Sequence, residues 1–216
     1  DPAATDCTFL VDLAEGKKLL PDPPIASIGY QASIVITPQQ EADMDIKATL
    51  NNLLIPYTSN YAGTLLPGIR EYTVTPGEKT TTISGKGKAG LKQEENYYFF
   101  YLPVCYKGIT GKSYAYYNTS RSKNLYLPAS VDENYSYDIQ LPENLTLCTP
   151  IQEKKIDNPI GSFKITLTSE GSSLHIELAL QIKKQLITPA EYPAFRSLIT
   201  EWTDRTRKPI LFKTVQ

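Results

Sequence analysis

The side chains that could perform acid–base or nucleophilic chemistry are few in this sequence. The single histidine, His175, lies in a run where apolar and polar residues alternate, and its polar-side neighbours Ser173 and Glu177 are spaced for contact with solvent. A Ser–His or Cys–His pair would need a nucleophile that reaches the ring from across a sheet. We therefore interpret His175 as an exposed strand residue, and we predict no catalytic residue in this chain.

Neighbouring carboxylates are also present, but their setting does not predict catalysis. General acid–base chemistry needs two carboxyl groups that face each other across a cleft, one with a pKa raised by burial. One pair here shares the polar side of a strand, and the other two lie beside turns, so we expect all of them on solvated surfaces. The three pairs are Asp43 with Asp45, Glu94 with Glu95, and Asp132 with Glu133.

No cofactor or metal is predicted from the glycine-rich and cysteine positions. The segment Ser84–Gly90 lacks the spacing of a phosphate-binding loop, and no helix follows it, so we expect a flexible basic hairpin tip. Cys7, Cys105 and Cys148 are too far apart for a zinc site or a disulfide framework. We expect small buried residues, with a Cys105–Cys148 bridge as the alternative.

Tyrosine is the conspicuous surplus, with 15 of the 216 residues. Tyr114, Tyr116, Tyr117 and Tyr126 lie close together in the sequence and form a possible binding surface. Aromatic rings on a β surface can stack on sugar rings or anchor a protein partner. The alternative, which we favour, is that these rings fill a contact between two domains and part of the core.

The composition excludes several classes of protein. The 22 basic and 23 acidic residues give a net charge of −1, which offers no electrostatic case for a nucleic-acid partner. No apolar run approaches the ~18 residues needed to cross a bilayer, so no membrane span is predicted. The 16 prolines and 12 glycines interrupt the chain often, which is typical of short strands joined by turns.

Apolar and polar residues alternate with a period of two along much of the chain, which indicates half-buried strands. The clearest case runs from Leu174 to Ile182. Tyr97–Leu102 is instead apolar on both sides, and we predict either a central strand covered on both faces or a strand enclosed at a contact between domains. We predict a mainly β fold of two antiparallel β-sandwich, immunoglobulin-like units. The predicted divisions are a connector over 1–27, a first unit over 28–120, and a second over 121–216.

One amphipathic helix is predicted near the C-terminus, over residues 189–204. Thr188 is the expected N-cap, Pro189 takes the first helical position and Glu191 the third, which makes a capping box. The face that this helix should bury carries five large side chains at three- and four-residue steps. These are Tyr192, Phe195, Leu198, Ile199 and Trp202.

The second unit resembles a known family through segments that occur in a recognisable order. The segments are NLYLP at 124–128, YDIQLPE at 137–143, NPIGSF at 158–163 and ITPAEYPAFR at 187–196. They resemble the C-terminal domain of unknown function that follows the transglutaminase-like, papain-like core in proteins of Gram-negative gut bacteria. The resemblance is good over about 121–213 and looser from about residue 34.

The resemblance implies a context for the chain and no activity of its own. A catalytic Cys-His-Asp set would lie upstream, in a segment that this chain does not contain, so we expect the chain not to be an enzyme. It would be a non-catalytic accessory region that braces the catalytic core or presents a surface to a partner or substrate. The alternative is an independent β-sandwich module that binds a glycan or a protein. The resemblance also implies a periplasmic or cell-surface location.

Overall fold

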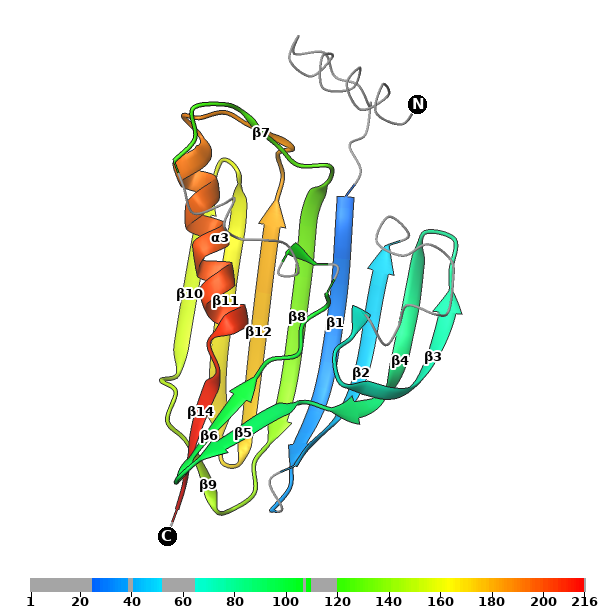
Figure 1. Ribbon diagram of the computed structural model, residues 1–216, viewed down its shortest axis with the longest axis vertical. Helices are drawn as coiled ribbons and strands as arrows, with labels where there is room; N and C mark the ends of the chain where they lie inside the picture. Colours follow the sequence, from blue (N-terminus) through cyan, green and yellow to red (C-terminus); the bar gives the residue numbers. More distant parts are fainter. Residues whose placement is uncertain (1–24, 39–40, 52–64, 107, 110–119, 216) are drawn as a thin grey trace.

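A computed structural model describes residues 25–38, 41–51, 65–106, 108–109 and 120–215 of the chain. These residues form three β-sheets and one long helix (Figure 1). The elements are β1 (Ile25–Ile36), β2 (Ala42–Asn51), β3 (Ile69–Pro76), β4 (Thr80–Lys88), β5 (Gly90–Glu94), β6 (Tyr97–Tyr101), β7 (Leu125–Tyr126), β8 (Ser130–Gln140), β9 (Leu145–Leu147), β10 (Gln152–Asn158), β11 (Gly161–Glu170), β12 (Ser173–Ile182), β13 (Leu186–Ile187), α3 (Tyr192–Arg207) and β14 (Ile210–Thr214).

The largest sheet has eight strands in the order β10-β11-β12-β8-β1-β2-β4-β3. Five of its inner strands, β1, β2, β8, β11 and β12, alternate between buried and more exposed residues, as the period of two predicted. In β12 the run Leu174 to Ile182 buries every second side chain. All neighbouring strands are antiparallel except β1 and β8, which run parallel from the pair Ile25–Ser130 to the pair Val35–Gln140. The two-stranded sheet pairs β13 with β7.

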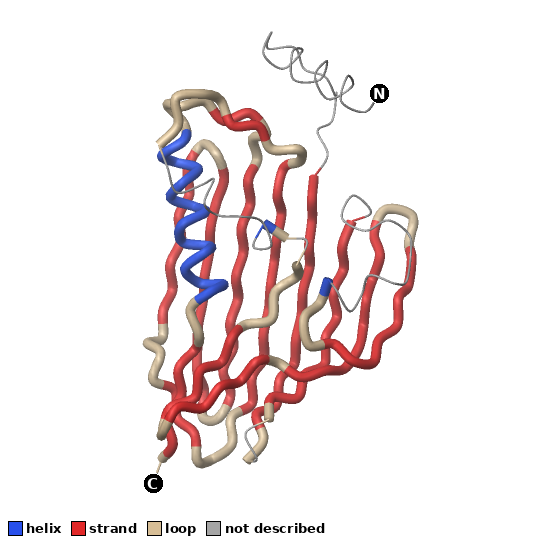
Figure 2. Tube along the Cα trace, viewed as in Figure 1, coloured by secondary structure: helices blue, strands red, loops and turns tan. Residues whose placement is uncertain are grey.

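One face of the large sheet is covered and the other is open. Helix α3 and the four-stranded sheet β5-β6-β14-β9 both lie on the covered side, the helix over β10 to β12 and the small sheet across the other end (Figures 1 and 2). Trp202 of the helix is fully buried and packs its ring 5.7 Å from that of Tyr135 and 6.5 Å from that of Phe163. We call the opposite side, which carries the alternate polar residues of the strands, the open face.

The helix is confirmed, but it begins later than predicted. It spans Tyr192–Arg207, and the five large side chains listed above are its buried residues. Glu191 occupies the N-cap position. Its carboxylate accepts hydrogen bonds from the backbone N–H of Thr188 at 3.1 Å and from the Thr188 hydroxyl at 3.0 Å. Half of the capping box is therefore present. The Thr188 hydroxyl, however, donates its hydrogen bond to the Glu191 carboxylate and does not accept one from a helical N–H group. The prediction that Thr188 caps the helix is wrong.

The strand pairing differs from the two separate sandwiches that the sequence predicted. The mainly β fold with one helix near the C-terminus is confirmed, whereas the immunoglobulin-like pairing is not. The parallel pairing of β1 with β8 joins strands from both sides of residue 120 into one sheet. Of the expected connector over 1–27, residues 1–24 lie outside the described part, and Ile25–Ser27 already belong to β1.

The prediction that Ser84–Gly90 forms a hairpin tip is wrong. Most of it belongs to β4, which is paired on both sides, and the chain then passes into the small sheet at Gly90. A Cβ atom on Gly85 would lie 2.2 Å from the carbonyl oxygen of Glu71, and one on Gly87 would lie 2.1 Å from that of Gly68. These glycines are needed because the backbone of β3 approaches that of β4 closely where the register between the two strands shifts.

Candidate functional site

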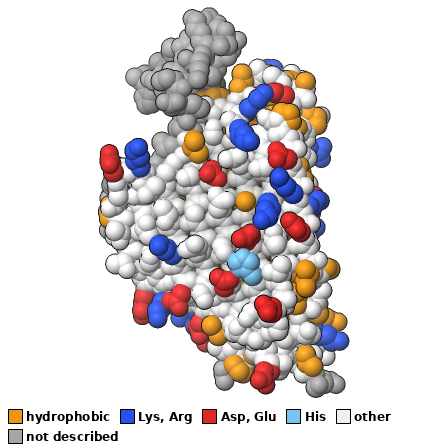
Figure 3. Space-filling model, turned by 180° about the vertical axis from the view of Figure 1, so that it is seen from behind, with side chains coloured by type: hydrophobic (Ala, Val, Ile, Leu, Met, Phe, Trp, Pro, Cys, Tyr) orange, Lys and Arg blue, Asp and Glu red, His pale blue; other side chains and the backbone are white. Residues whose placement is uncertain are grey.

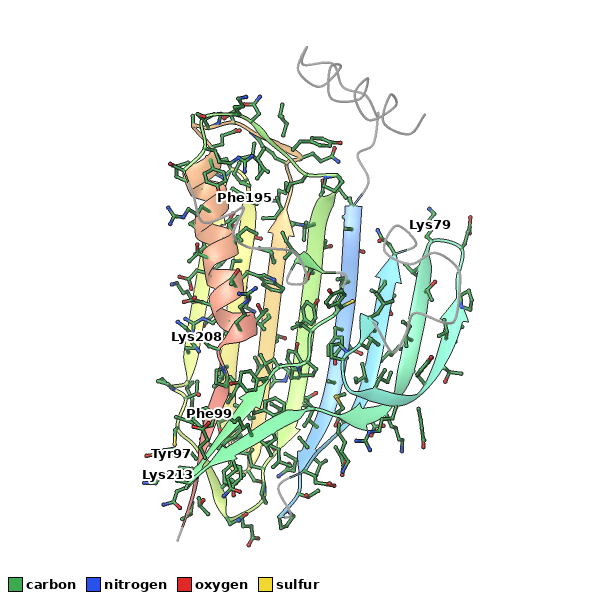
Figure 4. The ribbon with its side chains drawn as sticks, viewed as in Figure 1. Lys79, Tyr97, Phe99, Phe195, Lys208 and Lys213 are labelled. Atoms are coloured by element: carbon green, nitrogen blue, oxygen red, sulfur yellow. The ribbon has the colours of Figure 1, made fainter. Side chains whose placement is uncertain are left out.

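The outer face of the small sheet carries a row of exposed aromatic rings. Tyr97, Phe99 and Tyr101 occupy alternate positions of β6, while Tyr98 and Phe100 between them are buried against the covered side. Tyr97 is 38% exposed and Tyr101 is 44% exposed, and Phe99 between them is half-buried. We call these three residues the aromatic stripe; Figure 4 labels Tyr97 and Phe99 at the lower end of the molecule.

Charged side chains border the aromatic stripe on both neighbouring strands. On β14, Lys213 is paired with Tyr97 and holds its ammonium group 5.8 Å from the centre of the ring, close enough for a cation–π interaction. On β5, Lys92 forms an ion pair of 2.5 Å with Glu94, and the hydrogen bond and charge of Glu94 raise the pKa of Lys92. An aromatic centre with a charged, solvated rim is typical of protein recognition surfaces.

This stripe was not identified from the sequence. The run of five aromatic residues at Tyr97–Tyr101 hides the period of two. Within this chain the strand is not covered on both faces, because one face is exposed; the alternative, a strand enclosed at a contact with another domain, stays a prediction. Of the predicted tyrosine cluster, Tyr114, Tyr116 and Tyr117 lie outside the described residues. Tyr126 lies half-buried in β7, where burial raises the pKa of its hydroxyl.

The open face of the large sheet is a second candidate surface, and its chemistry is different. Figure 3 shows acidic and basic side chains scattered over this side of the molecule, with the histidine among them. A depression of about 570 Å³ lies where Gly29 of β1 and Ala179 of β12 leave room above the sheet. We call it the hollow. The other side chains of the open face that line it are Gln31, Lys47, Thr49, Asn134, Ser136, Lys164 and Glu177.

His175 lies on the open face, as predicted, and its ring contacts acidic side chains. Its Nδ1 is 2.7 Å from a carboxylate oxygen of Asp138 on β8, and its Nε2 is 3.6 Å from a carboxylate oxygen of Glu177 on its own strand. The hydrogen bond to Asp138 is the largest of the influences that raise the pKa of His175. Thr168 is paired with His175 on the other side, in β11.

One predicted surface carboxylate proves to be buried. Asp43 and Asp45 are exposed on β2, and Glu94 and Glu95 are exposed beside a turn, as expected. Glu133 is only 2% exposed, because it lies on the covered side of β8 in phase with the buried tyrosines. Its carboxylate accepts hydrogen bonds from the backbone N–H of Ile109 and from the hydroxyl of Tyr135 at 3.1 Å. Glu133 therefore fixes the backbone of Ile109 over the covered face.

The two described cysteines have different surroundings. Cys105 and Cys148 are both free thiols, so the alternative of a bridge between them is wrong. Cys105 is fully buried, as expected, whereas Cys148 is exposed beside the small sheet. Cys7 lies outside the described part of the chain. Within that part, no group of three or more His, Cys, Asp or Glu side chains is arranged to hold a metal ion, and no helix has the length and hydropathy of a membrane span.

Comparison with known proteins connects the second half of the chain to a described family. Residues 96–212, more than half of the chain, match the model of the domain of unknown function DUF3858, which is described as having a solved structure. The crystal structure of a protein described as a "putative protease" from Parabacteroides distasonis is similar over 56% of this chain and 24% of that one, with 30% identity and a TM-score of 0.49. The chain thus spans about a quarter of that protein. No curated protein matches it.

Proposed function

This chain belongs to the DUF3858 family, and we propose that it is a non-catalytic accessory region of a longer transglutaminase-like or peptidase-like bacterial protein. In this proposal it presents the aromatic stripe to the rest of that protein and braces the catalytic core. The proposed place of the chain, after a transglutaminase-like core, rests on its sequence resemblance. The same resemblance supports a periplasmic or cell-surface location and an upstream domain as the principal partner.

The observation that carries this proposal is the exposure of the aromatic stripe. About two fifths of the surface of Tyr97 and of Tyr101 is exposed to water, although their strand, β6, lies between β5 and β14 in the small sheet. Covering apolar surface yields about 25 cal/mol for each Å² removed from water, so three adjacent rings favour a docked state. Leu211 of β14, which is paired with Phe99 on the same face, extends the apolar area beyond one strand.

The experiment is a calorimetric titration of this chain against the separately expressed upstream core. We expect saturable binding that weakens at least about tenfold when Tyr97 and Tyr101 are both changed to serine, since aromatic anchors dominate such interfaces. The matched control is Tyr72→Ser, because Tyr72 is also a strand tyrosine, 42% exposed, and lies in β3 of the other sheet. Binding that is absent, or equally weakened by the control, would contradict docking through the stripe.

The second candidate is an independent module that binds a glycan or a protein through the same stripe. It is favoured by the alternate placement of the rings along one strand, which sets them about 7 Å apart in a row, with Lys92, Glu94 and Lys213 beside them to bind hydroxyl groups. This candidate would be favoured if the chain does not bind the upstream core but binds a neutral oligosaccharide, and if the double tyrosine variant loses that binding.

A further inference from the structure

We propose that the hollow on the open face is a binding site for a short acidic oligosaccharide. This site is separate from the aromatic stripe, because the hollow is on the uncovered side of the large sheet and the stripe is on the small sheet. The proposal does not depend on the role proposed for the chain as a whole. It rests on three features of the hollow: a floor opened by a glycine and an alanine, walls of uncharged hydrogen-bonding groups, and a lysine at each end.

The floor exists because two residues of one cross-strand row, on either side of Asn134, lack long side chains. Ala179, Asn134 and Gly29 are paired in line across β12, β8 and β1. A Cβ atom built on Gly29 would meet nothing nearer than the carbonyl oxygen of Thr49, at 3.9 Å, so packing does not require a glycine there. Glycine within a strand costs stability relative to residues with a side chain. Nothing in the surroundings of Gly29 therefore requires a residue without a side chain at this position.

The walls consist of groups that both donate and accept hydrogen bonds. Asn134 and Ser136 of β8, Gln31 of β1 and Thr49 of β2 are all on this face. Amide and hydroxyl side chains have both capacities, as sugar hydroxyls do. The backbone groups beneath them are already used in the strand ladders. A peptide would therefore find no main-chain partners here, whereas a sugar can pair with the side chains alone.

Each end of the hollow carries a lysine. Lys164 of β11 is at one end, 3.2 Å from Glu177, and Lys47 of β2 is at the other, where its cross-strand neighbours Gln31 and Ser84 are uncharged. With Glu177 included, the lining side chains have a net charge of +1. β11 and β2 are four strand spacings apart in the sheet order, or about 19 Å. This width suits two or three sugar units with a carboxylate directed toward Lys47.

The test is an NMR titration of the ¹⁵N-labelled chain with trigalacturonic acid, with maltotriose as a neutral sugar and triglutamate as an acidic peptide. We expect saturable shifts of the amides around the hollow with trigalacturonic acid, and at least about tenfold weaker binding of the other two probes. Saturation that is absent, that occurs at the aromatic stripe, or that is equal for either of the other two probes would overturn the proposal.

Two substitutions sharpen this test. Gly29→Thr fills the floor, and an added Cβ atom there would lie 3.9 Å from the nearest atom, the carbonyl oxygen of Thr49. We expect trigalacturonic acid binding to fall about tenfold or more. Lys47→Gln should weaken binding severalfold, whereas Lys86→Gln, which removes a lysine from the same face outside the hollow, should not. Unchanged binding by Gly29→Thr, in a variant with a native-like amide spectrum, would place the ligand elsewhere.

Discussion

The open face of the large sheet and the aromatic stripe of the small sheet are both uncovered, but they face water in opposite ways. On the open face the alternate positions of the strands carry amides, hydroxyls and paired charges such as Lys164 with Glu177. On the small sheet the same alternate positions of β6 carry Tyr97, Phe99 and Tyr101. The intervening residues of β12 in the large sheet are buried as completely as those of β6 in the small one. The fold thus determines which side of a strand is exposed, but it does not determine which residue types occupy that side.

This difference gives the two surfaces different free-energy costs when they are left uncovered. A polar sheet face is stable in water without a partner, and any ligand must compete with water for its hydrogen bonds. Covering exposed aromatic rings, by contrast, lowers the free energy. We therefore infer that the aromatic stripe favours a lasting contact, and that the hollow favours a reversible one. The predictions below test the contrast between covered and uncovered positions, beginning with the largest expected effect.

Leu178→Asp should unfold the protein, whereas Thr168→Asp should not. Leu178 is 1% exposed and is paired with Ile165 and Tyr135 on the covered side, so the variant buries an unpaired carboxylate; we expect a loss of about 4 kcal/mol or more. Thr168 of β11 is exposed on the open face. Urea denaturation measures both, and a cooperatively folded Leu178→Asp variant would contradict the assignment of the covered side.

Trp202→Ala should cost about 4 kcal/mol of unfolding free energy, as for other large buried aromatic residues. The ring is fully buried and packs against Tyr135 and Phe163, so its removal leaves a cavity beneath the helix. By contrast, Tyr101→Ala in the aromatic stripe should cost about 1 kcal/mol or less, because that ring is largely in solvent. Similar losses for the two variants in urea denaturation would mean that the stripe is part of the core.

Thr188→Ala should have a smaller effect, about 0.5 kcal/mol, in urea denaturation. The variant removes the hydroxyl that donates to Glu191 but retains the backbone N–H that donates to the same carboxylate. The pKa of Glu191 is lowered to about 2, first by the hydrogen bond from Lys184 and then by those from Thr188. The stabilisation from Glu191 is thus present above its ordinary pKa of 4.5 and is lost as the pH falls toward 2. A Glu191→Gln variant should lack that dependence.

The smallest effect is expected from His175 on the open face. Its pKa is raised by the hydrogen bond to Asp138, so its contribution is complete below its ordinary pKa of 6.5 and is lost as the pH rises through the raised value. The ring is solvated, which limits the contribution to a few tenths of a kcal/mol. Urea midpoints of the natural protein and of His175→Gln, compared across that pH range, should converge at the alkaline end; a constant difference would contradict the Asp138 contact.

The sequence predicts most of the local structure because alternation and helical spacing depend on neighbouring residues. The strand from Leu174 to Ile182 and the buried face of α3 were both recognisable for this reason. Glu133 was predicted to lie beside a turn on a solvated surface, but it lies within β8 and in phase with the buried Tyr135 and Tyr137. The aromatic stripe was missed because both sides of β6 are aromatic and only the tertiary packing decides which side is covered.

The parallel pairing of β1 with β8 could not be predicted, since it joins residues that are always 105 positions apart, from Ile25 with Ser130 onward. The hollow depends on that pairing too, because Gly29 and Asn134 become neighbours only through it. Local patterns contain no information about which distant strands meet. The predicted division at residue 120 followed from breaks in the pattern, and the strand partners cross that division.

The same pairing has a consequence for the order of folding. The hairpin of β1 and β2 can form as soon as it leaves the ribosome, but β1 must keep its other edge unpaired until β8 has been synthesised, some 105 residues later. Contacts of such long sequence separation slow folding, and unpaired strand edges invite association with other chains. Cutting the chain at residue 120 would leave two newly unpaired strand edges on each fragment, those of β1 and β6 on the first and those of β8 and β14 on the second. The two fragments should then aggregate when expressed alone and recover solubility when expressed together.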